Sequence, residues 1–127
     1  MEIKLKDIKG YVNAINVLSS EKIPLKVAFK LAKLKREIAD QADFYDEHFR
    51  QIIMDNAELD ENGLPVSKDN GLTVQIKPEC VQETNKLLKE LNELTVEIGN
   101  YKFNVEDFGD VEISADTLSE LIDFIEE

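Results

Sequence analysis

The chain has 127 residues, of which 43% are hydrophobic, and its 27 acidic and 15 basic residues give a net charge of −12. This length predicts a single domain, residues 1–127, with a buried core, and no apolar run approaches the roughly 18 residues that a membrane span needs. An acidic surface repels nucleic acid and anionic membranes and attracts basic partners, although it also simply aids solubility. The lone Cys80 excludes an internal disulfide, and the charged start Met1–Lys4 lacks the apolar core of a secretory signal, so we expect a cytoplasmic protein.

Two amphipathic helices are predicted in the first half of the chain. Residues 8–18 show apolar side chains at helical spacing, and residues 24–56 form a helix about 50 Å long that begins with a proline, which suits a first turn. The apolar positions of the long helix follow in steps of three or four and form one stripe: Val27, Leu31, Leu34, Ile38, Ala42, Tyr45, Phe49 and Ile52. We expect the other segments to pack against this stripe.

The long helix carries a second set of side chains away from its core stripe. At 100° per residue, Phe29 and Phe44 point to the side opposite Leu31. Neighbours on two sides of the helix would bury both rings; if the rings are exposed, they predict a patch that binds a protein partner. An acidic stripe runs along the same side: Asp40, Asp43 and Glu47.

Charge is divided unevenly along the first half of the chain. From Lys22 to Arg36 there are six basic residues and no acid, whereas Glu37 to Glu61 holds nine acids and one base, Arg50. We expect the basic segment to pair with the acidic C-terminal segment, although exposed ion pairs contribute only about 0–1 kcal/mol each.

The middle of the chain changes from a helical period to a period of two. Residues 62–77 predict a β-hairpin, because Asp69-Asn70-Gly71 is a turn signal that adopts positive φ values. Pro78 then opens another amphipathic helix that is about half as long as the first. Together these elements predict an antiparallel helical hairpin over residues 24–94 with the β-hairpin at its tip.

The last third of the chain predicts a second β-hairpin and a final helix. Residues 95–105 alternate on either side of Gly99-Asn100, and residues 115–126 form an acidic helix capped by Ser114 or by Thr117. The outer face of that helix is acidic and includes Asp116, Glu120 and Asp123. The predicted fold class is α+β: a long antiparallel helical hairpin, a small antiparallel β-sheet of two hairpins, and short helices at both termini.

Few residues have the character of a reactive site. His48 is the only histidine, which excludes a histidine metal cluster and a Ser-His-Asp triad, and Cys80 has no histidine near it in sequence. Glu58-x-Asp60-x-Asn62-Gly63 imitates the first half of a calcium loop, but Asp69 stands where a longer glutamate is needed. We interpret this run as a plain turn and expect no metal, no cofactor and no enzyme. A calcium-responsive loop over Glu58–Asp69 stays as an alternative.

Several segments together resemble a group of small uncharacterised proteins of tailed bacteriophages and prophages. They are Ile23-Pro24-Leu25-Lys26 leading into Phe29–Leu34, the Asp60–Gly63 turn, and the ending Ile113–Leu118. In that group a short helix, a long Lys-rich helix, a charged turn, a second helix and an acidic C-terminus follow in this order. The resemblance covers most of the chain and implies a viral protein, in the host cytoplasm or the virion, with a non-enzymatic role. The group has no assigned catalytic residues to carry over.

These observations lead to two functional hypotheses from different classes. The first is a small acidic protein-interaction module, a phage accessory or assembly factor, which binds a protein with a basic or apolar surface and touches neither nucleic acid nor membrane. A homo-oligomer stays open. The alternative is an inhibitor that mimics nucleic acid against a basic host defence protein. Two acidic sets would then replace phosphates: Asp40, Asp43 and Glu47, or Asp116, Glu120 and Asp123.

Overall fold

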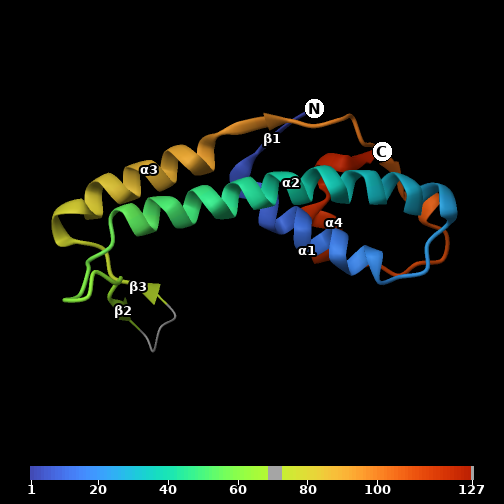
Figure 1. Cartoon of the computed structure of the whole chain (residues 1–127). Helices are drawn as coiled ribbons and strands as arrows, with labels where there is room; N and C mark the ends of the chain where they lie inside the picture. Colours follow the sequence, from blue (N-terminus) through green and yellow to red (C-terminus); the bar gives the residue numbers. More distant parts are fainter. Residues whose placement is uncertain (69–72, 127) are drawn as a thin grey trace.

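A single long helix organises the computed structural model, which describes residues 1–68 and 73–126. Helix α2 (Leu25–Asp55) runs unbroken for 31 residues along the whole molecule (Figure 1), as the sequence predicts. Its buried side chains belong to the predicted stripe: Val27, Leu31, Leu34, Ile38 and Tyr45. Towards the C-terminal end the stripe loses its cover, because Ile52 is only half-buried and Phe49 is 39% exposed.

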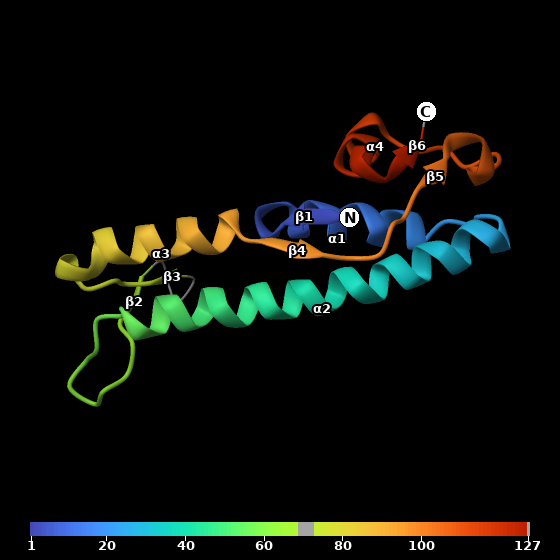
Figure 2. The ribbon, with the colours of Figure 1, turned by 90° about the horizontal axis from the view of Figure 1, so that it is seen from above.

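The N-terminal half of α2 packs against α1. Strand β1 (Glu2–Lys4) and the 3₁₀ turn η1 (Leu5–Asp7) lead into α1 (Ile8–Ser19). The buried face of α1 follows the predicted helical spacing: Ile8, Tyr11, Ala14, Ile15 and Leu18. In Figure 2, α1 lies between α2 and the C-terminal segment, so it is covered on both sides. This end of the molecule holds most of the core.

The C-terminal half of α2 packs against a much shorter helix. The 3₁₀ turn η3 (Pro78–Cys80) opens α3 (Val81–Glu93), whose 13 residues lie along that half only (Figure 1). The Tyr45 hydroxyl donates a hydrogen bond of 2.6 Å to Asn92 Oδ1 and joins the two helices. The shorter second helix that the sequence predicts is therefore present, but the two helices do not form a hairpin of two long helices over residues 24–94. At Leu94 the backbone becomes extended, with ψ of 138°, and the chain leaves the helix to form a strand.

Within residues 1–68 and 73–126, three separate two-stranded sheets replace the predicted single sheet. Strand β4 (Thr95–Glu97) pairs antiparallel with β1, with Ile3 opposite Val96. Strand β5 (Phe103–Asn104) pairs in parallel with β6 (Ile125–Glu126). The predicted β-hairpin over residues 95–105 is therefore wrong, because each of its strands pairs with a chain terminus. The Gly99 amide faces the carboxylate of Glu37, at 3.3 Å from both oxygens, where a tight turn was expected.

The insertion after α2 forms the third sheet, which projects from the end of the molecule (Figure 1). Strand β2 (Ser67–Lys68) pairs antiparallel with β3 (Thr73–Val74), and bridges join Ala57 to Ile76 and Leu59 to Pro65. The antiparallel pairing predicted within residues 62–77 is confirmed for β2 and β3. The predicted turn residues Asp69, Asn70 and Gly71 lie outside the described residues.

The C-terminal segment is not the single helix predicted over residues 115–126. Helix α4 (Ala115–Glu120) is capped by Ser114, whose hydroxyl accepts a hydrogen bond from the Thr117 amide. A 3₁₀ turn η5 (Ile122–Phe124) and β6 follow, and a second 3₁₀ turn η4 (Val105–Phe108) precedes α4. The break has a packing reason. The Phe124 ring is completely buried against the edge of the Tyr11 ring, and the chain then continues as a strand beside β5.

Candidate interaction surfaces

The predicted interaction residues of α2 lie together on one exposed side, which we call the outward face. Its members are the two rings and three carboxylates singled out from the sequence: Phe29, Asp40, Asp43, Phe44 and Glu47. Phe29 is 64% exposed and Phe44 is 40% exposed, so the outcome in which neighbours bury both rings does not occur. The reason is geometric: α1 and α3 pack on the core stripe of α2 and leave the opposite side uncovered.

The Phe29 end of the outward face is apolar and basic. The Lys33 ammonium lies 4.6 Å from the centroid of the Phe29 ring, within the range of a cation–π interaction. Leu25, one turn earlier, is 85% exposed and extends the apolar surface. The sequence interpretation missed Leu25, although its spacing of four residues from Phe29 was the available signal. This end can accept an apolar side chain or an acidic one.

The Phe44 end of the outward face is aromatic and acidic. The His48 ring stacks on Phe44 with centroids 4.0 Å apart and planes 28° apart, and His48 Nδ1 lies 3.0 Å from the Phe44 carbonyl oxygen. Asp40 and Glu47 flank the ring one turn before and one turn after it. The two aromatic ends are about 22 Å apart along the helix axis. A partner that contacts both must therefore be extended or must itself present a helix.

The carboxylates of the outward face point into solvent. Asp40, Asp43 and Glu47 are exposed, and the ion pairs found in residues 1–68 and 73–126 involve other acids. Steps of three and four residues separate the three carboxylates by about 4.5 and 6 Å along the axis. The arrangement is a short row of negative charges that can face a row of basic groups.

The second predicted acidic set lies elsewhere. Asp116 and Glu120 are exposed on α4, while Asp123 belongs to η5 and accepts a hydrogen bond of 2.9 Å from the Tyr11 hydroxyl. Burial, followed by this hydrogen bond and the charge of Asp123, raises the pKa of Tyr11 above its usual value. Figure 2 shows α1 between α2 and α4, so the structure does not bring the two acidic sets together. Asp123 has a structural role in holding the C-terminal segment on α1.

The basic segment does not meet carboxylates of the C-terminal helix in the described part of the chain. The Lys30 ammonium donates to the backbone carbonyl of Lys102 and lies 5.1 Å from the centroid of the Phe103 ring. Lys30 therefore contacts the main chain just before β5 and the ring of the first residue of β5. Lys102 donates in turn to the backbone carbonyl of Asp123, at 2.7 Å.

The loop that imitates a calcium site forms ordinary turn contacts. Asp60 Oδ1 accepts hydrogen bonds from the amides of Asn62 and Leu64, and Glu58 Oε2 accepts one of 2.6 Å from the Gln75 side chain. The twelfth position, Asp69, lies outside the described residues. Within residues 1–68 and 73–126, no three His, Cys, Asp or Glu side chains are grouped as metal ligands. The calcium prediction stays untested.

Comparison with protein-family models, with curated proteins and with solved structures gives no match. The resemblance to tailed-phage proteins therefore rests on the segments quoted above and stays a prediction. In the described part of the chain, no helix is both long and apolar enough to cross a membrane.

Proposed function

We propose that this chain is a small non-enzymatic protein-interaction module, an accessory or assembly factor of a tailed bacteriophage, that binds a protein partner through the outward face of α2. The observation that carries the proposal is the exposure of Phe29 and Phe44 on a helix whose opposite side is deeply buried. Exposed aromatic side chains are costly to keep in water and are enriched at the centre of protein interfaces. The phage context is supported by the resemblance of the segments quoted above.

The rigidity of α2 also supports this proposal. The N-terminal half of the helix is anchored by Leu31, Leu34 and Ile38, which are at most 3% exposed. The backbone of such a helix loses little further freedom when a partner binds, so more of the contact energy appears as affinity. Two sites about 22 Å apart on one rod also present a fixed spacing to the partner.

The test is site-specific photo-crosslinking in phage-producing cells. A photoreactive residue at position 29 or 44 is expected to capture the same partner protein, whereas one at exposed Lys89 of α3 serves as the matched control and is expected to capture none. In the purified complex, Phe29→Ala and Phe44→Ala should each weaken binding at least tenfold, about 1.4 kcal/mol, with little dependence on salt. Capture from position 89 alone would contradict the proposal.

A second candidate function is mimicry of nucleic acid against a basic protein. It is favoured by the row of solvent-facing carboxylates Asp40, Asp43 and Glu47. In this case affinity falls steeply with salt concentration, and the triple substitution Asp40→Asn, Asp43→Asn, Glu47→Gln abolishes binding while Phe29→Ala is tolerated. The two candidate functions are therefore distinguished by measuring affinity against salt concentration for the wild-type complex, for the phenylalanine variants and for the carboxylate variant.

A further inference from the structure

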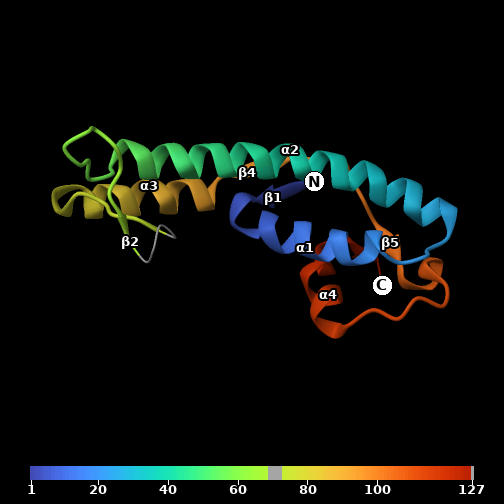
Figure 3. The ribbon, with the colours of Figure 1, turned by 60° about the horizontal axis from the view of Figure 1, so that its bottom comes forward.

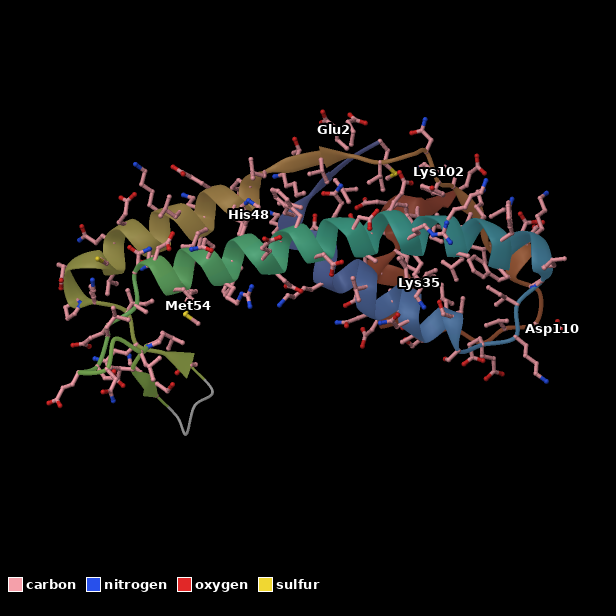
Figure 4. The ribbon with its side chains drawn as sticks, in the orientation of Figure 1. Glu2, Lys35, His48, Met54, Lys102 and Asp110 are labelled. Carbon is pink, nitrogen blue, oxygen red and sulfur yellow. The ribbon has the colours of Figure 1, made fainter. Side chains whose placement is uncertain are left out.

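One side of α2, next to the core stripe, is only partly covered in the described structure: Ala32, Lys35, Ala39 and Asp46 are exposed, whereas Ala28, Ala42 and Ile53 are half-buried. Its residues recur in alternating steps of four and three, and we call them the seam: Ala28, Ala32, Lys35, Ala39, Ala42, Asp46, Phe49 and Ile53. Ala42 and Phe49 also belong to the predicted core stripe, so the two stripes share an edge. The seam residues from Ala28 to Asp46 line three adjoining hollows of about 470, 210 and 260 Å³ between α2 and α1. Figure 3 shows α1 and α2 side by side, and Figure 4 shows Lys35 at their border.

The spacing of the seam is that of a coiled coil. Alternating steps of four and three repeat every seven residues and keep a stripe facing one partner helix. Small side chains at Ala28, Ala32, Ala39 and Ala42 allow a second helix to approach closely, while Phe49 and Ile53 are large. At the N-terminal end, Ala28 and Ala32 leave room for large residues of a second helix, while Ala39 and Ala42 allow close approach in the middle.

The order of charges on α2 is unfavourable for a helix alone. Its N-terminal half is basic and its C-terminal half is acidic, the reverse of what the helix dipole favours. No acidic residue lies in its first turn and no basic residue lies in its last. A partner helix that runs in the opposite direction with the same charge order would place acid against base at both ends.

We propose that two copies of this chain form a dimer in which their α2 helices pack antiparallel along the seam. The two-fold axis passes between Asp40 and Gln41, so that every seam residue of one copy faces a seam residue of the other copy. The layers pair each residue with one of the second copy: Ala28 with Ile53, Ala32 with Phe49, Lys35 with Asp46, and Ala39 with Ala42. Small residues meet large ones in the two outer layers, and the pair of Lys35 and Asp46 occurs twice because of the two-fold symmetry.

The charges beside the seam select the same register. Arg36 and Asp43 are seven residues apart and both lie directly beside the seam. In the antiparallel pair, Arg36 of one copy lies next to Asp43 of the other copy. A parallel pair would instead place Lys35 against Lys35 and Asp46 against Asp46. The charge pattern therefore specifies orientation as well as association.

The contact that Asp46 makes within its own chain does not prevent this pairing. Its carboxylate lies 3.9 Å from the Lys9 ammonium, and both side chains are more than half exposed, so this ion pair is weak. Lys9 adds a base beside Lys35 of the second copy, and Asp46 can face both. The dimer goes beyond the proposed function, because it uses the seam and leaves Phe44 and Glu47 of the outward face uncovered.

The test is sedimentation of the full chain over a range of concentrations, with charge-reversed variants. The wild-type chain is expected to be dimeric at micromolar concentration. Lys35→Glu and Asp46→Lys each weaken the dimer about tenfold, because each creates two repulsive pairs, and the double variant regains affinity. Lys33→Glu, which carries the same charge change but points away from the seam, is the matched control and leaves the dimer intact.

A wild-type chain that stays monomeric at high micromolar concentration overturns the proposal, as does a dimer whose affinity the double variant fails to regain. Ala39→Arg gives an independent readout at an exposed position, because its bulk separates the central layer and should yield a monomer with unchanged circular dichroism. A dimer that Ala39→Arg leaves unaffected forms through another surface, which also overturns the proposal. In the photo-crosslinking that tests the proposed function, position 44 lies away from the seam, whereas position 29 shares the heptad position of Arg36 and Asp43 beside it. Capture of a different protein from position 44 therefore supports the proposed function whatever the outcome for the dimer.

Discussion

The two halves of α2 have the same helical geometry but different surroundings. In the N-terminal half, Leu31, Leu34 and Ile38 are enclosed by α1 and by segments from both ends of the chain. In the C-terminal half, α3 is the main cover, and Phe49 and Met54 are 39% and 42% exposed. The comparison teaches that one helix can be core at one end and surface at the other. The stability of the fold should therefore reside mainly at the N-terminal end of α2.

The largest expected effect separates the two halves directly. Leu34→Ala should lower the free energy of unfolding by about 2–5 kcal/mol, because the side chain is completely buried and leaves a cavity. Ile52→Ala, on the same helix but half-buried, should cost less than half as much. Urea unfolding of both variants measures the difference. Equal losses would remove the contrast between the two halves.

The next effect concerns the N-terminal end at high pH. Burial and the hydrogen bond to Asp123 raise the pKa of Tyr11, so the unfolded chain releases this proton at lower pH than the folded chain does. The stability that Tyr11 contributes is complete below about pH 10 and falls by up to about 1.4 kcal/mol per pH unit above it. The melting temperature of the wild-type chain should fall relative to that of Tyr11→Phe only in that range, while the difference between the two stays constant at lower pH. Parallel pH profiles would contradict the role of this hydroxyl.

A smaller effect is expected where α3 joins α2. Tyr45→Phe removes the hydrogen bond to Asn92 and should cost about 0.5–1.5 kcal/mol, because the ring keeps its packing. The measurement is urea unfolding combined with hydrogen exchange of the α3 amides, which should speed up more than those of α1. A uniform change in both helices would mean that the two ends unfold as one unit.

The smallest effect has the opposite sign. The buried Thr84 hydroxyl on α3, a helix that packs against α2, has no hydrogen-bond partner among the described residues. Thr84→Val replaces it with a methyl group of similar shape and should leave stability unchanged or raise it by up to about 1 kcal/mol. A loss of stability in thermal melting would show that the hydroxyl is satisfied in solution.

The elements that the sequence predicts well are those with many repeats of one period. The stripe of α2 extends over about seven helical turns, so its length and its buried side follow from the spacing of its apolar residues. The exposure of Phe29 and Phe44 depends on whether neighbours cover a second side of the helix. The spacing along the sequence predicts which way the two rings point, but not how many other helices pack against α2.

Strand pairing could not be predicted in the same way. Strands of two or three residues, such as β4 and β5, alternate on both sides of Gly99-Asn100 and fit a hairpin as well as any other partner. Their actual partners come from the two chain termini, more than 20 residues from β5 in the case of β6. The helix predicted over residues 115–126 is longer than the observed α4 for a related reason. Burial of Phe124 against Tyr11 overrides the helical pattern that its own segment shows.

The most direct test of the difference between the two halves of α2 is native-state hydrogen exchange, resolved by residue, in the dilute chain. The amides from Val27 to Ile38 should exchange only through global unfolding, and those from Glu47 to Asp55 through local opening at much lower free energy. Equal protection along the whole helix would contradict the account, because it would mean that both halves of α2 are held by the same core.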